Sequence, residues 1–296
     1  MGTTLTEETA LVFECQGEQL VGILHKPANP MAVGIVPVIA GGPQYRAGVS
    51  RNMVEMAREL SAAGVPVLRF DHRGLGDSSG TFLGFRHIRD DIQAAIDCLR
   101  REVPQVTEVV LWGGCDAASA CMIHGADLSG VCSMVLGNPF VTTEKTQAAV
   151  QRQHYLRRLR EGSFWRKLLR FEYKPGDYLR AAWRGFVARL RPGRGTKKAA
   201  AAAADSEDWI FHMREGLRRF EGPVLFLMSG KSLVSKEFDD LVGRDRDWQK
   251  ICNRGHYRRI DLPEADQTFS GADSRERVNR ALREWLQQMN ERVAGS

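Results

Sequence analysis

The chain has 296 residues, of which 43% are hydrophobic and 26% are charged, and its formal net charge is +6. This length is enough to bury a large core, and the composition is that of an ordinary globular protein. No apolar run approaches the roughly 20 residues that cross a bilayer, and the polar residues 1–8 do not resemble a signal peptide. We therefore expect a cytoplasmic protein. The six cysteines are scattered without a CxxC pair, which argues against a disulfide framework and against a metal site.

The positive charge is concentrated in one block. Residues 151–198 contain fifteen Lys or Arg and three acidic residues, so the rest of the chain is net acidic. A basic block of this kind often binds an anionic partner. The simpler interpretation is a solvated helical face whose aromatic side chains pack on the rest of the fold.

Helical and apolar patterns alternate along the first half of the chain. In order, the expected elements are strands over 9–15, 20–25 and 33–40, a helix over 50–63, a strand over 65–70, a helix over 88–101, a strand over 109–112, a helix from 118 and a strand over 131–136. A glycine-rich loop, 71–80, follows the strand over 65–70. Strands that alternate with helices predict a mostly parallel sheet with helices on both faces, an α/β fold.

The alternation stops near Pro139 and resumes at Gly222. Between them lie about 80 basic, aromatic residues of helical character, with a low-complexity stretch at 192–204. We interpret 139–221 as an inserted basic helical lid above the carboxyl edge of the sheet, which divides the core into 1–138 and 222–296. Strands over 224–228 and 257–262 and a helix over 275–292 complete the expected fold.

The most informative stretch joins the strand over 109–112 to the following helix. Gly113, Gly114 and Ala117 surround Cys115 in a turn of small residues. A strained turn between a strand and a close-packed helix requires such residues, and it would expose the cysteine at its tip. The alternative is a structural cysteine at the end of a buried strand, since free cysteines are often small core residues.

Four features occur in the order typical of one superfamily: a GGPQ loop at 41–44, the loop 70–78 (FDHRGLGDS), the turn at Cys115 and the late segment 265–270 (ADQTFS). Together they resemble the α/β-hydrolase superfamily over nearly the whole chain, with Cys115 in the nucleophile elbow. More narrowly, residues 41–46 (GGPQYR), 111–116 (LWGGCD) and 265–270 are similar to the exosortase A system-associated hydrolase 1 group. These are bacterial proteins encoded beside exopolysaccharide genes.

The resemblance implies a nucleophile, a histidine after the last strand and an acid after the preceding strand. Cys115 matches the nucleophile, but Gln267 stands at the histidine position and Ser232 at the acid position. A helix amino terminus is expected to lower the pKa of the Cys115 thiol. The oxyanion hole would use backbone N–H groups of Asp116 and of Gly42 or Gln44, because Pro43 has none. The implied substrate is a small acyl ester or thioester, with no cofactor and no metal.

A glutamine amide cannot accept and return a proton near neutral pH, so turnover is expected to be weak or absent. No other histidine offers a convincing replacement. His72 lies at the correct edge of the sheet, but the loop around it is expected to be structural, with Asp71, Arg73 and Asp77 as loop-fixing ion pairs. His256 precedes the last strand and so lies at the opposite edge. We assign His25 and His87 to the surface, His124 to the core or the surface, and His154 and His212 to the lid.

Two functions remain open. One is an acyl-directed hydrolase or acyltransferase with a cysteine nucleophile and a degenerate triad. The other is a pseudoenzyme that binds a ligand or partner through the old pocket and the basic lid. A basic lid with Trp and Phe side chains suits an anionic membrane surface or an acidic polymer, which would make the protein peripheral at the inner membrane. No nucleic-acid-binding module is recognisable.

Overall fold

A computed structural model describes residues 6–39, 45–141 and 209–295. The chain divides into two compact units, Met1–Val141 with Trp209–Ser296, and Thr142–Asp208. All structural statements below concern the described residues of the first unit.

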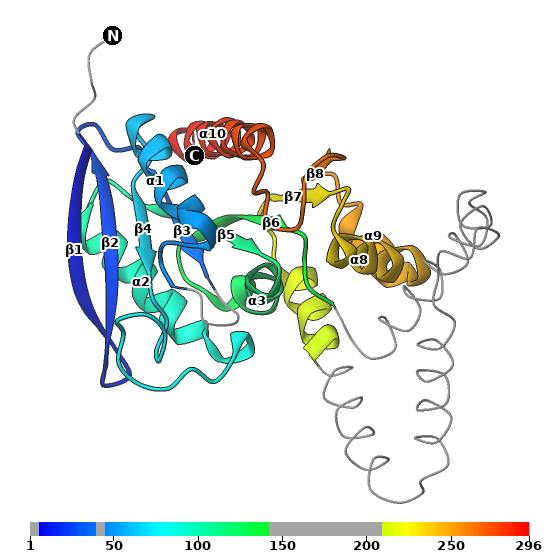
Figure 1. Cartoon of the computed structure of the whole chain (residues 1–296), viewed down its shortest axis with the longest axis horizontal. Coiled ribbons are helices and arrows are strands. Elements are labelled where there is room, and N and C mark those ends of the chain that lie inside the picture. Colours follow the sequence, from blue (N-terminus) through cyan, green and yellow to red (C-terminus); the bar gives the residue numbers. More distant parts are fainter. Residues whose placement is uncertain (1–5, 40–44, 142–208, 296) are drawn as a thin grey trace, which may run out of the picture. The chain divides into compact units, whose positions relative to one another are not determined.

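The first unit is built on an eight-stranded sheet in the order β1-β2-β4-β3-β5-β6-β7-β8 (Figure 1). β1 pairs antiparallel with β2, and β2 antiparallel with β4, whereas the pairs from β4 to β8 are parallel. The strands are β1 (Thr6–Cys15), β2 (Glu18–Pro27), β3 (Val33–Val38), β4 (Val67–Phe70), β5 (Glu108–Gly114), β6 (Val131–Gly137), β7 (Val224–Ser229) and β8 (Tyr257–Leu262). The carboxyl ends of six parallel strands therefore meet at one edge.

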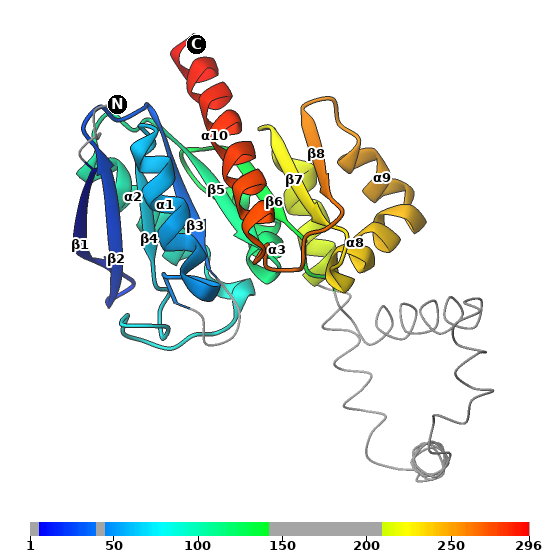
Figure 2. The same ribbon diagram turned by 45° about the horizontal axis from the view of Figure 1, so that its top comes forward.

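Helices cover both faces of this sheet (Figure 2). The helices are α1 (Asn52–Ala62), α2 (Arg89–Glu102), α3 (Asp116–His124), α8 (Leu233–Arg244), α9 (Arg246–Cys252) and α10 (Ala272–Ala294), and residues 209–219 are also helical. α1 and α10 bury Leu60 and Leu282 in one apolar cluster, while α2, α3 and α8 bury Ile96, Ala118 and Phe238 in the other. The predicted α/β-hydrolase fold, a mostly parallel sheet between helical layers, is thus confirmed.

Continuous apolar runs explain why the strands were predictable. Every residue of β3, β4 and β7 is buried, as expected for parallel strands covered on both faces. From the sequence, no element is assigned between the strands over 224–228 and 257–262. The structure has two helices there, and Asp245 begins the second because its carboxylate accepts from the Asp247 and Trp248 N–H groups at 2.8 and 3.3 Å.

The predicted lid, 139–221, has two described ends, residues 139–141 and 209–221. Both belong to the first unit. Trp209, Met213, Leu217 and Phe220 are buried in the apolar cluster of α2 and α3. The Trp209 ring stacks almost parallel to Phe140, with 5.9 Å between ring centroids. The rest of the predicted lid, 142–208, lies outside the described residues, and so does the whole basic block.

Three absences hold for the described part of the chain. None of its helices has the length and apolarity required to cross a membrane. All six cysteines lie in this part, and each is a free thiol. Within the same residues no cluster of His, Cys, Asp or Glu has the make-up of a metal site.

Candidate active site

Cys115 occupies a strained turn between β5 and α3. Its backbone angles are φ 58° and ψ −122°, a conformation that is costly for a residue with a side chain. The turn is held by the Cys115 N–H, which donates to the carbonyl of Gly137 at 2.8 Å. A Cβ added to Gly113 would lie only 2.6 Å from the carbonyl group of Ala117, so α3 can approach β5 only past a glycine. Of the small residues predicted for this turn, Gly113 is therefore sterically required.

The Cys115 turn opens into a pocket of about 350 Å³ at the carboxyl edge of the sheet. The strands β3 and β5, the start of α1, the start of α3 and the loop after β8 all contribute to its wall. The described lining residues are Val38, Ile39, Gly48, Val49, Asn52, Met53, Trp112, Gly114, Cys115, Asp116, Ala117, Gln267, Thr268 and Phe269. Apolar side chains dominate, and no histidine is present among these lining residues. Such a lining suits an uncharged acyl group.

The structure brings Cys115 and Gln267 together although 152 residues separate them. The Gln267 Nε2 group donates a hydrogen bond to the Cys115 Sγ atom at 3.3 Å. The side chain at the expected histidine position is therefore aimed at the sulfur. It can orient the thiol and stabilise negative charge on it, but an amide cannot carry its proton away.

Burial decides the ionisation of this thiol. Desolvation raises the pKa of Cys115 to about 11, and the neighbouring Asp116 carboxylate raises it as well. Hydrogen bonds to the sulfur from the Asp116 N–H and from Gln267 act in the opposite direction but do not compensate. The sequence-based expectation of a lowered pKa at the helix amino terminus was therefore wrong, because desolvation outweighs the end of a nine-residue helix.

Ser232, at the predicted acid position, makes its hydrogen bond within α8. Its hydroxyl accepts from the Ser235 N–H at 3.2 Å and so caps the first turn of α8. Among the described residues, no hydrogen bond joins it to Gln267. For the oxyanion hole, the Asp116 N–H lowers the pKa of the Cys115 thiol and so favours negative charge beside it, whereas Gly42 and Gln44 lie outside the described residues.

Sequence reasoning missed Asn138, which follows β6 and is fully buried. Its Nδ2 group donates to the Ser229 hydroxyl at 2.8 Å and to the Gln267 carbonyl at 2.9 Å. Its Oδ1 atom accepts from the Ser229 N–H at 2.8 Å. One amide thus ties the ends of β6 and β7 to the loop that presents Gln267. The sequence feature that could have indicated this role is the Asn138-Pro139 pair at the carboxyl end of a buried strand.

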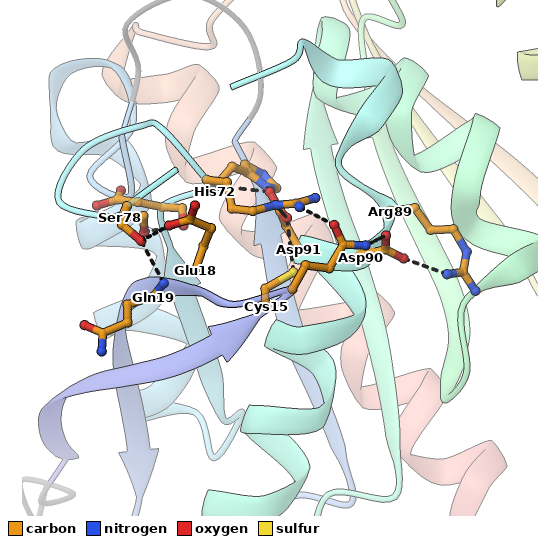
Figure 3. Close-up of polar contacts among 12 residues, drawn as sticks. Cys15, Glu18, Gln19, His72, Ser78, Arg89, Asp90 and Asp91 are labelled. Carbon is orange, nitrogen blue, oxygen red and sulfur yellow. Dashed lines mark hydrogen bonds and ion pairs between the residues drawn. The ribbon is translucent and has the colours of Figure 1, made fainter. Parts of the chain in front are cut away.

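The loop 71–80 is a structural network, as predicted. The Arg73 guanidinium pairs with Asp91 at 2.5 Å, and Arg46 pairs with both Asp71 and Asp77. In Figure 3 the Asp91 carboxylate lies between Cys15 and His72, whose contacts to it are 3.4 Å each. His72 is wholly buried in this cluster and does not line the pocket. His256 packs its ring edge-on against Tyr257, at the amino end of β8.

Comparisons with known proteins agree with this architecture. The model of the Alpha/beta hydrolase family matches residues 39–269. Among solved structures, an esterase from Pyrococcus furiosus is 13% identical with a TM-score of 0.62, covering 96% of this chain and 91% of its own. The protein Est1E from Butyrivibrio proteoclasticus, solved with ferulic acid, is 18% identical with a TM-score of 0.60, covering 96% and 100%.

A dienelactone hydrolase from Anabaena variabilis is similar in the same way, with 14% identity, a TM-score of 0.57 and coverage of 96% and 98%. At these identities the likeness to solved structures concerns the fold. No curated protein matches the chain significantly in sequence. Fold, strained elbow and pocket define a protein of the α/β-hydrolase class. Because the family model spans most of its length, the chain belongs to the alpha/beta hydrolase family.

Proposed function

We propose that this protein forms an acyl-cysteine at Cys115 from a small ester or thioester and releases the acyl group slowly. The observation that carries the proposal is the strained Cys115, which lies in a largely apolar pocket with the Gln267 amide 3.3 Å from its sulfur. The Asp116 N–H, which already lowers the pKa of this thiol, would donate to the oxyanion. In the resulting degenerate triad, Gln267 and Ser232 replace the histidine and the acid, so the usual triad base that activates water for deacylation is missing.

The same short motifs support a finer proposal, membership of the exosortase A system-associated hydrolase 1 group. That identity rests on residues 41–46, 111–116 and 265–270. It would place the protein in the bacterial cytoplasm beside exopolysaccharide synthesis.

Intact-mass spectrometry after incubation with a panel of acyl thioesters and activated esters tests the main proposal. We expect an adduct of one acyl group that maps to Cys115 and is absent in Cys115→Ala. Cys252→Ala is the matched control, since its partly buried thiol is not among the pocket-lining residues. No adduct in the parent protein, with Cys115 still open to iodoacetamide, would refute the proposal.

Restoring the missing side chains tests the degenerate triad separately. Gln267→His with Ser232→Asp should raise esterase turnover above the parent, because a base and its orienting acid typically contribute about three orders of magnitude or more. Ser232→Asp alone is the control, and it should leave turnover unchanged. An equal rate in the double variant and the parent would count against a latent triad.

A second candidate function is a pseudoenzyme that binds an acyl ligand or a partner without reacting. The raised pKa of Cys115, about 11, favours this candidate because the thiol is neutral at physiological pH. A saturable ligand that protects Cys115 from alkylation, in a protein that forms no adduct, would support it.

We further propose that the basic segment 151–198 binds an anionic surface, either a membrane or an acidic polymer. Its fifteen basic against three acidic residues support this role. The protein should sediment with vesicles of anionic lipid and not with neutral vesicles, and added salt should release it. Equal binding to both kinds of vesicle would contradict the electrostatic explanation.

A further inference from the structure

The pocket holds one acidic group for which the lost triad gives no explanation. Of the described residues that line it, Cys115 and Asp116 are the only two that titrate. Asp116 is the first residue of α3 and directly follows Cys115. Its side chain therefore reaches the same cavity as the thiol.

The Asp116 carboxylate lacks a cationic partner in the part of the chain that the structure describes. Its Oδ1 atom accepts from the Ala117 N–H at 3.0 Å, and no ion pair with a described Lys, Arg or His is formed. Asp116 is half-buried, and a largely desolvated carboxylate without a counter-charge is unfavourable, which points to a role in the site.

The other described residues that line the pocket are uncharged. Asn52 and Met53 of α1 line the pocket, and Gln267 and Thr268 line it from the loop after β8. In that loop, the Asp266 carboxylate is occupied by Thr268 and Ser270. An adjoining hollow is lined by Arg275 and Glu55, which form an ion pair with each other at 3.1 Å. Among the described residues of the lining, Asp116 is therefore the one group besides the thiol that can take up or give up a proton near neutral pH.

We propose that Asp116 is the general base and acid for acylation of Cys115, taking the place of the missing histidine. This inference rests on the proposed function. The Sγ–carbon bond forms while the carbonyl electron pair moves to oxygen, and the thiol proton passes to the Asp116 carboxylate. When the tetrahedral intermediate collapses, the bond to the leaving thiolate or alkoxide breaks and Asp116 returns the proton to it. The products are S-acyl-Cys115, a free thiol or alcohol, and the original carboxylate.

Burial supports this role. Desolvation raises the pKa of Asp116 to about 6, which brings the carboxyl close to the working pH of a general base. The two groups also oppose each other's ionisation, since the Asp116 charge raises the pKa of the thiol. A single negative charge shared by carboxylate and thiol is therefore the favoured state of the pocket.

The test is the pH dependence of acyl-cysteine formation, followed by intact mass with an N-acetylcysteamine thioester. With Asp116 as base, the rate should rise to a plateau above an inflection near pH 6. A free thiolate would instead give a rate that rises about tenfold per pH unit up to pH 9, because its pKa is near 11. That second profile in the parent protein would overturn the proposal without any variant.

The isosteric variant Asp116→Asn is an independent test, because a general base and a merely repulsive charge predict opposite changes in the acylation rate. We expect acylation at pH 7.5 to fall about 100-fold and the inflection to disappear. Alkylation of Cys115 by iodoacetamide at pH 9.5 should be equal or faster, since the charge that opposes the thiolate is gone. Asp97→Asn, an exposed change on α2, is the control and should match the parent.

The outcomes are distinct. Acylation that is unchanged or accelerated in Asp116→Asn would show that the carboxylate only suppresses the thiolate, and would overturn the proposal. Absence of an adduct in the parent protein would instead refute the proposed acyl-cysteine function itself.

Discussion

Asn138→Asp replaces a buried amide by a carboxylate of the same shape. The change removes two donated hydrogen bonds, to the Ser229 hydroxyl at 2.8 Å and to the Gln267 carbonyl at 2.9 Å. The Ser229 hydroxyl cannot turn to donate, because it already donates to the Asp266 carbonyl at 2.7 Å. The bond from the Ser229 N–H to Oδ1 is retained. The positive φ of 47° is tolerated equally by Asn and Asp.

The expected loss follows from these contacts. Each buried oxygen left without its donor costs about 1–3 kcal/mol, and both would now face a negative charge. We therefore expect the free energy of unfolding at pH 7 to fall by about 3–5 kcal/mol. Protonation restores one donor, so the native pKa of the new carboxyl lies above its unfolded value. The deficit should then shrink as pH falls towards 4.

Urea unfolding at pH 7 and pH 4.5 measures this loss, with Asn253→Asp as the matched control. Asn253 is exposed at the end of α9, and its change should cost at most about 1 kcal/mol. A loss below about 1 kcal/mol in Asn138→Asp, or the same loss at both pH values, would refute the view that one amide ties these strand ends together.

Three further predictions concern the elbow, the sulfur and a buried histidine. Gly113→Val should lower the melting temperature sharply or prevent folding, since its Cβ would meet α3 at 2.6 Å, whereas Gly114→Ala, with open space, should be nearly neutral; equal effects would contradict the packing argument. Gln267→Ala should slow alkylation of Cys115 at pH 8.5, because the variant loses the hydrogen bond from the side-chain amide that lowers the pKa of the thiol. An unchanged rate would show that this hydrogen bond does not influence the thiol. His25 was expected on the surface, but it is fully buried in the sheet, where its Nε2 atom accepts from Arg69 at 2.9 Å and desolvation lowers its pKa to about 4. Between pH 6.5 and 4 the unfolded chain therefore binds a proton that the native state does not bind, so the free energy of unfolding should fall by about 3 kcal/mol across this range. In thermal melts at pH 7 and 4.5, His25→Gln should reduce this pH dependence. An unchanged pH dependence in the variant would refute the assignment to His25.

The general architecture could be predicted because it depends on the order of apolar, polar and small residues within short stretches of the chain. The apolar runs of β3 and β7 leave no alternative to strands buried on both faces. Gly113 beside Cys115 predicts a tight strand-to-helix turn, and the structure explains it by the contact with Ala117. The sequence alone also places Gln267 where the resemblance implies a histidine, because that comparison depends only on residue identity.

Only the tertiary structure determined the chemistry of the pocket. Whether Cys115 ionises depends on how much water its neighbours exclude, and those neighbours come from β3, α1, α3 and the loop after β8. The sequence indicated the helix amino terminus, which lowers a thiol pKa, but could not indicate the larger cost of burial. Asn138 was hidden for the same reason, since its partners Ser229 and Gln267 lie 91 and 129 positions away. Hydrogen bonds and desolvation between distant segments exist only after the chain has folded.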